Sequence, residues 1–156
     1  MPASTMVKTT GAVFVSAAVG GLASRPARSA WYEQLKKPRF QPPAQVFPIV
    51  WPILYADIAL VSASTIDRLH DCRPRQAYAT LLAANLVMNA SWTWLFFTRR
   101  QLGASAVTAA ALTVTGVDLT RRAVGARGSS AAVLGLYPLW CAFATALSTR
   151  IWQLNR

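Results

Sequence analysis

Residues 31–55 read WYEQLKKPRFQPPAQVFPIVWPILY, and this stretch decides the fold. Five of its residues are prolines, each of which lacks a backbone N–H and holds φ at about −65°. Residues 31–44 are therefore predicted to form an ordered, extended loop. Beyond them the chain becomes apolar and enters a helix, with Pro48 in its first turns and a kink expected at Pro52.

Charged clusters divide the rest of the chain into apolar runs. Of the 156 residues 54% are hydrophobic and 13% are charged, whereas a soluble domain carries roughly 25% charge. A helix needs about 20 apolar residues to cross the hydrocarbon layer, and five runs are long enough or nearly so. They lie at 9–24, 45–66, 76–98, 101–120 and 129–149. We therefore expect residues 1–156 to form one all-α integral membrane domain, a five-transmembrane-helix bundle with a proline-rich loop between helices 1 and 2.

The runs 9–24 and 101–120 are weaker than the others because they consist largely of Ala, Gly, Val and Thr. Small residues let neighbouring helix backbones approach closely, which favours a compact bundle. The small residues of the first and third helices also suit packing against a second copy of the chain, so we expect a homodimer. For 9–24 a cleaved signal peptide is the alternative, because Lys8 precedes an Ala-rich apolar stretch. Membrane insertion does not depend on that choice, since four runs follow.

The net charge of +11 comes from sixteen Lys and Arg against five Asp and Glu. Nucleic-acid binders gather basic residues on one accessible face, but here they flank the apolar runs, so the lipid bilayer is the expected partner and nucleic acid is not. The side that carries the C-terminus holds nine basic residues and the other side seven. The positive-inside rule then predicts a cytoplasmic C-terminus, in what we expect to be a bacterial cell membrane.

The third run places polar and aromatic residues on one face. Asn85, Asn89, Trp92 and Phe96 are spaced i, i+4, i+7 and i+11, which is the spacing of one helix face. Two amides in hydrocarbon must face protein or a cavity. With Trp51 and Tyr55 of the second run and Trp140 and Phe143 of the fifth, they suit a pocket for a flat apolar ligand. Ordinary packing, with the asparagines joining helices, is the alternative.

The proline-rich loop also allows two interpretations. Trp31, Tyr32 and Phe40 carry rings of the kind that anchor proteins at membrane interfaces, as a rigid connector would. A loop of this length is more often functional than a plain connector, which suits a lid over a cavity. No nucleotide loop, nucleophile elbow or HExxH motif occurs, so we expect no catalytic residue, no metal site and no required cofactor.

Three motifs follow one another along the chain. The first is W-Y-x-x-L-x-K-P-x-F-x-P-P-x-x-V-F-x-x-V-W-x-x-L-Y from Trp31 to Tyr55, the second N-x-x-W-x-x-x-F-F from Asn89 to Phe97, and the third W-x-A-F-A-T-x-L from Trp140 to Leu147. In this order they resemble the TspO/MBR family, which comprises the tryptophan-rich sensory proteins and the translocator proteins, or peripheral benzodiazepine receptors.

The resemblance implies a five-helix bundle, often dimeric, whose pocket is closed by the loop between the first two helices. It implies a membrane protein that binds tetrapyrroles, protoporphyrin IX or haem, as ligands and transports or senses them in a stress response. The alternative is an enzyme for light- and oxygen-dependent porphyrin degradation, with Trp51 and Trp140 as the residues involved. The expected ligand-binding residues are Trp31, Phe40, Phe47, Trp51, Tyr55, Asn85, Asn89, Trp92, Phe96, Trp140 and Phe143.

The chain also departs from the family pattern. Asn85 stands where Gln is usual, which keeps the amide but shortens the side chain by one methylene. Thr149 stands where the cholesterol motif of the animal proteins has Tyr, so sterol recognition of that kind is unsupported. Asp57 has no family counterpart, and we expect it to pair with a neighbouring polar group inside the second span.

Overall fold

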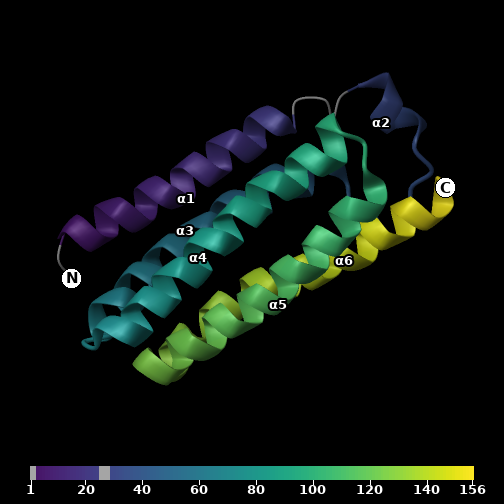
Figure 1. Ribbon diagram of the computed structural model, residues 1–156. Coiled ribbons are helices and arrows are strands. Elements are labelled where there is room, and N and C mark those ends of the chain that lie inside the picture. The colour runs from purple at the N-terminus through teal and green to yellow at the C-terminus, as the bar shows by residue number, and fades with distance from the viewer. Residues whose placement is uncertain (1–2, 25–28) are drawn as a thin grey trace.

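The computed structural model describes residues 3–24 and 29–156, which form helices joined by short connections (Figure 1). The long helices are α1 (Ala3–Ala23), α3 (Phe47–Arg68), α4 (Cys72–Thr93), α5 (Leu102–Arg127) and α6 (Leu136–Leu154). The shorter elements are α2 (Ala30–Gln34), the 3₁₀ segments Ala44–Val46 and Ser129–Gly135, and a π-helical segment, Trp94–Thr98, that directly continues α4.

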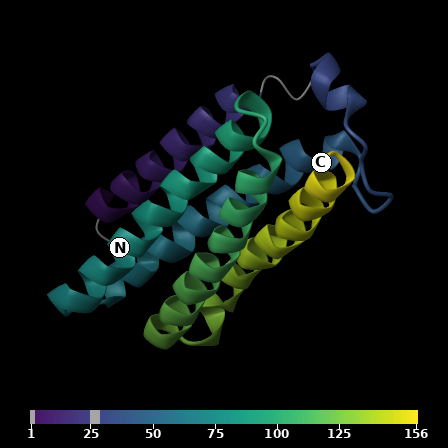
Figure 2. The same cartoon turned by 45° about the vertical axis from the view of Figure 1, so that its right-hand side comes forward.

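The long helices lie side by side in a bundle (Figures 1 and 2). α1 packs against α3 and α4, α4 packs against α5, and α5 has its most extensive contact with α6. One end of the bundle holds the N-terminus and the turn between α3 and α4, and the opposite end holds α2 and the C-terminus. Elements from residues 30–46 are thereby brought close to the last turns of α6.

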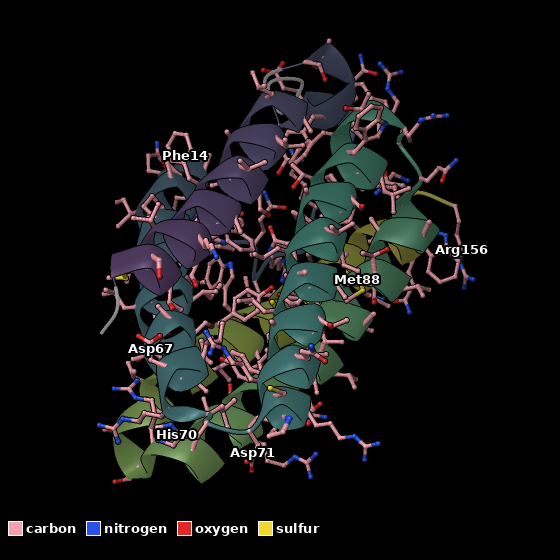
Figure 3. All side chains as sticks on the ribbon, turned by 60° about the vertical axis from the view of Figure 1, so that its left-hand side comes forward. Phe14, Asp67, His70, Asp71, Met88 and Arg156 are labelled. Carbon is pink, nitrogen blue, oxygen red and sulfur yellow. The ribbon has the colours of Figure 1, made fainter. Side chains whose placement is uncertain are left out.

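The surface of the bundle is strongly apolar. Phe14 is 71% exposed, Ile53 61%, Val114 69% and Leu139 67%, and these residues come from four different helices. Phe14 projects outward from α1 (Figure 3). Soluble proteins rarely expose apolar side chains around their whole circumference, whereas a lipid environment accommodates them at no cost. The exposed apolar belt therefore agrees with an integral membrane protein.

Four helical stretches are long and apolar enough to cross a membrane, namely Ser4–Ala23, Ala44–Arg68, Leu102–Arg127 and Ser129–Leu154. They overlap the predicted spans 9–24, 45–66, 101–120 and 129–149, although residues 129–135 of the last one form a 3₁₀ segment. The small-residue runs, expected to be weaker, are among them. The range 76–98 forms α4 and the π segment, which are not in that set because Gln76, Asn85 and Asn89 lower the mean hydropathy. Its crossing of the membrane stays a prediction.

The prediction of an extended loop over 31–44 is wrong for its first residues. Ser29 caps a short helix, α2, because its Oγ accepts a hydrogen bond of 3.4 Å from the backbone N–H of Tyr32. Such caps favour helix starts even in short segments. The backbone turns extended at Leu35. Pro48 lies in the first turn of α3, as expected, and α3 continues as a helix through Pro52.

The contact between α5 and α6 depends on Gly116. A Cβ atom at this position would lie 3.1 Å from Cβ of Pro138 and 3.3 Å from the ring of Tyr137. At Gly125 of the same helix nothing lies within 4 Å. Gly116 therefore sets how closely the two helices approach, whereas Gly125 does not.

We predict that Gly116→Leu destabilises the bundle by about 1–3 kcal/mol, because the added side chain forces α5 and α6 apart. Gly125→Leu is the matched control and should leave stability unchanged or slightly raised, since leucine is the better helix former. The measurement is the thermal unfolding midpoint in detergent micelles. Equal midpoints for the two variants would show that the α5–α6 contact does not limit stability.

Candidate functional site

A chain of hydrogen bonds crosses the interior of the bundle. The Tyr55 hydroxyl donates to Oδ1 of Asn89 at 2.8 Å, and Nδ2 of Asn89 donates to the Tyr137 hydroxyl oxygen at 3.3 Å. The Tyr137 hydroxyl donates to Oδ1 of Asn85 at 2.6 Å, and Nδ2 of Asn85 donates to Oγ1 of Thr115 at 2.7 Å. The chain therefore joins α3, α4, α6 and α5.

Both asparagines that the sequence placed on one helix face are buried, with exposures of 1% for Asn85 and 3% for Asn89. Their partners Tyr137 and Thr115 were missed by sequence reasoning. Tyr137 is 1% exposed, and a buried tyrosine needs a partner for its hydroxyl. This requirement could have indicated from the sequence that Tyr137 bonds to another buried polar group. Identifying that group requires knowing how two helices are rotated about their axes, which the sequence does not give.

Aromatic side chains gather where α4 passes into the π segment. The rings of Trp92 and Phe96 stack with centroids 5.7 Å apart. From α2, the rings of Trp31 and Tyr32 meet Phe96 edge-on at 6.5 Å and 6.3 Å. Phe96 is only 3% exposed. The segment after α1 thus contributes two of the rings that cover the end of α4.

A second aromatic group lies on α6. Phe47 meets Trp140 at 5.9 Å, Trp140 meets Phe143 at 5.3 Å, and Phe143 meets Phe40 at 6.3 Å. Phe47 and Phe143 also pack on the apolar cluster that contains Phe96, so the two groups belong to one end of the bundle. The segment from Trp31 to Phe47 therefore contacts aromatic side chains of both the π segment and α6.

Trp51 lies on α3 beside the hydrogen-bonded chain. Its ring stacks on Tyr55 at 5.5 Å with 29° between the planes, as the spacing of one helical turn suggests. Tyr55 in turn donates to Asn89. All eleven residues singled out from the sequence thus take part in the ring contacts or hydrogen bonds just described. We call these eleven residues the aromatic site.

One buried polar atom in the aromatic site has no partner among the described residues. Nε1 of Trp92 is buried and makes no hydrogen bond within the described residues. Buried polar atoms are nearly always hydrogen-bonded, so this donor is suited to an acceptor atom of a ligand. Oδ2 of Asp57 is likewise buried without a hydrogen bond to any described residue, and the pairing expected for Asp57 is not found at that atom.

The loop over the aromatic site is tied to the C-terminal end of α6. The Lys36 N–H donates to Oδ1 of Asn155 at 2.9 Å, and Nδ2 of Asn155 donates to the Lys36 carbonyl oxygen at 2.9 Å.

Nζ of Lys37 lies 4.2 Å from the ring centre of Tyr32. Burial raises the pKa of the Tyr32 hydroxyl, and the hydrogen bond from Gln41 opposes this in part. Tyr32 therefore stays neutral at physiological pH.

A groove on the surface of the molecule lies away from the aromatic site. A groove of about 800 Å³ runs between α1 and α4, and none of the eleven residues of the aromatic site lines it. Within the aromatic site the rings touch one another directly. The aromatic site and the groove are therefore separate features of the bundle.

Comparisons with known proteins agree with the three sequence motifs. The model of the TspO/MBR family matches residues 9–153. The uncharacterized membrane protein YtaB of Bacillus subtilis is 31% identical over 130 residues, which cover 83% of each chain. The tryptophan-rich sensory protein of Cereibacter sphaeroides is 32% identical over 126 residues, 80% of this chain and 77% of its own. The human translocator protein is 30% identical over 128 residues, 80% and 75% of the two chains.

We predict that Tyr137→Phe lowers the free energy of unfolding by about 1–3 kcal/mol, because it leaves Oδ1 of Asn85 and Nδ2 of Asn89 buried without partners. Tyr32→Phe is the control, since the Tyr32 hydroxyl only accepts a 3.3 Å bond from the half-buried Gln41. Thermal unfolding in detergent, followed by circular dichroism, compares the two. An unchanged midpoint for Tyr137→Phe would mean that the hydrogen-bonded chain contributes nothing to stability.

Proposed function

Because the chain belongs to the TspO/MBR family, we propose that it crosses the membrane with five helices and binds a tetrapyrrole, protoporphyrin IX or haem, to transport or sense it. Relatives bear the names translocator protein and tryptophan-rich sensory protein. The observation that carries the proposal is the meeting of aromatic side chains from α2, α3, α4 and α6 beside a hydrogen-bonded chain of amides and hydroxyls.

The fifth crossing is assigned to α4. Its 22 residues span about 33 Å at ~1.5 Å per residue, which matches the roughly 30 Å hydrocarbon layer. Asn85 and Asn89, which lower its mean hydropathy, are buried and hydrogen-bonded within the bundle. Polar side chains inside a membrane protein are tolerated when they face other helices. The hydropathy of the lipid-facing residues of α4, and not that of the whole helix, therefore decides whether the helix can cross the membrane.

The chemistry of the aromatic site suits a flat, mainly apolar ring system with acidic edges. Tryptophan and phenylalanine rings stack on such a ligand, and the free Nε1–H of Trp92 can donate to it. Lys36, Lys37 and the exposed Arg39 lie in the loop above, where cations can pair with propionate groups. The reciprocal bonds between Lys36 and Asn155 keep this loop in place until a ligand enters.

The proposed orientation places the C-terminus in the cytoplasm of a bacterial cell. Arg99, Arg100, Arg150 and Arg156 lie at the end of the bundle that carries the C-terminus. Lys36, Lys37 and Arg39 lie at the same end, so seven of the nine basic residues counted for that side gather there. The positive-inside rule favours the cytoplasm for such an end.

We predict saturable quenching of tryptophan fluorescence when protoporphyrin IX is titrated into the purified protein. Trp92→Ala and Trp140→Ala should each weaken binding about tenfold, because each removes a ring and its stacking area. Trp94→Ala is the control, since Trp94 is 47% exposed and lines the groove between α1 and α4. Non-saturable quenching, or equal loss in all three variants, would argue against a binding site for porphyrin here.

Light-dependent degradation of the porphyrin is the second candidate function. Trp51 stacks on Tyr55, and Trp140 contacts Phe47 and Phe143, so both tryptophans lie within the aromatic site. Tryptophan side chains can give up an electron to an excited pigment, so Trp51 and Trp140 are the redox-active groups of this second proposal.

Illumination of the protein with protoporphyrin IX and oxygen distinguishes the two functions. If the chain degrades porphyrin, a new absorbing product forms in the wild type and is lost in Trp51→Phe and Trp140→Phe, while Trp94→Phe retains it. Absorption spectra and mass spectrometry of the pigment follow the reaction. Bleaching at the same rate in all proteins, or no product at all, leaves binding as the function.

A further inference from the structure

Two cations lie over the two aromatic rings of α2. The guanidinium carbon of Arg100 is 5.1 Å from the ring centre of Trp31, and Nζ of Lys37 is 4.2 Å from that of Tyr32. Both distances fall within the roughly 6 Å over which a cation is attracted to an aromatic face. The two rings meet Phe96 edge-on, so a single ring separates each cation from the buried part of the aromatic site.

The backbone brings Arg100 to this position by an unusual turn. Its φ is 57°, in the left-handed region that residues other than glycine seldom adopt. The turn ends the π segment, where the N–H groups of Arg99 and Gln101 donate to the carbonyl oxygens of Trp94 and Leu95, both at 2.9 Å. Left-handed residues and π-helical turns occur often at functional sites, which points to a role for the side chain that this turn orients.

No acid among the described residues forms an ion pair with either cation. The ion pairs of this part of the chain all involve Asp118 of α5, so Glu33, the acid of α2, pairs with neither Arg100 nor Lys37. A guanidinium stacked on a ring keeps the N–H donors at its edge, and these fit the two oxygens of a carboxylate. The ammonium of Lys37 has three donors. Both groups are therefore able to bind an acidic partner from outside the chain.

We propose that Arg100 and Lys37 bind the acidic edge of the ligand, so that the site selects a tetrapyrrole with free carboxylates over its ester. Protoporphyrin IX carries two propionates on one edge, and the two cations lie over neighbouring rings of one short helix. The macrocycle then lies among the rings of Trp92 and Phe96, with its carboxylates at α2. The inference rests on the proposed function and names the groups that recognise the acidic edge. Arg100 lies outside the eleven residues of the aromatic site.

The test is a titration of the full chain in detergent with protoporphyrin IX or with its dimethyl ester, followed by quenching of tryptophan fluorescence. Arg100→Gln and Lys37→Gln should each weaken binding of the free acid about fivefold and leave binding of the ester unchanged. The ester enters detergent micelles more readily than the acid. Each variant is therefore compared with the wild type for the same pigment, because the partition into micelles is then the same on both sides and cancels.

Two neighbouring cations serve as controls. Arg99→Gln removes the charge next to Arg100, which lines the groove between α1 and α4, and Arg150→Gln removes an exposed charge that bonds to Gln153 at the same end of the bundle. Neither should change the affinity for either pigment. An equal loss of acid binding in the controls would reduce the effect to net charge and overturn the inference.

The ester distinguishes recognition from a structural role of the two cations. If Arg100→Gln and Lys37→Gln weaken binding of the ester as much as that of the acid, the cations only hold α2 in place and the inference is wrong. Unchanged binding of the acid in both variants would also overturn it, while the proposed function would stand. If neither pigment binds saturably to the wild type, the proposed function fails and this inference fails with it.

Discussion

The hydrogen bonds from Tyr55 to Thr115 fix four helices at one level of the bundle. Hydrocarbon offers no partner to an amide or a hydroxyl, so leaving one of these groups buried and unpaired is costly. Asn85 and Asn89 can be buried only if α3, α5 and α6 turn suitable side chains toward α4. The rotation of each of these helices about its axis is therefore constrained by this chain of bonds.

The close contact of α5 and α6 helps to hold the same chain of hydrogen bonds in place. Thr115 accepts the bond from Asn85, and the next residue, Gly116, leaves room for the ring of Tyr137. A larger residue at Gly116 would push away the tyrosine whose hydroxyl links the two asparagines. One turn of α5 thus supplies both an acceptor and a gap, and the buried hydroxyl is held by packing as well as by hydrogen bonds.

The sequence predicts the helices well because charge marks their ends and apolar runs mark their lengths. It also predicts the buried face of α4, since Asn85 and Asn89 recur at a helical spacing. The short helix α2 is missed because the prolines of the 31–55 stretch begin only at Pro38, beyond its end, while Ser29 caps its start. The π segment Trp94–Thr98 and the partners Thr115 and Tyr137 are missed because they depend on how neighbouring helices are rotated.

The mean hydropathy of α4 understates how well this helix suits a membrane. Asn85 and Asn89 face the interior, while Ala83, Val87 and Ala90 line the groove toward α1. Ala83 and Val87 precede Asn85 and Asn89 by two residues each, which is a rotation of about 200° around the helix. The two asparagines and this apolar set therefore lie on different sides of the helix, although Gln76 and Ser91 are polar residues on the groove side. The mean hydropathy averages over both sides of the helix, whereas a bilayer contacts only the outer one. The same rotation separates the aromatic site from the groove, so α4 can contribute to both without either obstructing the other.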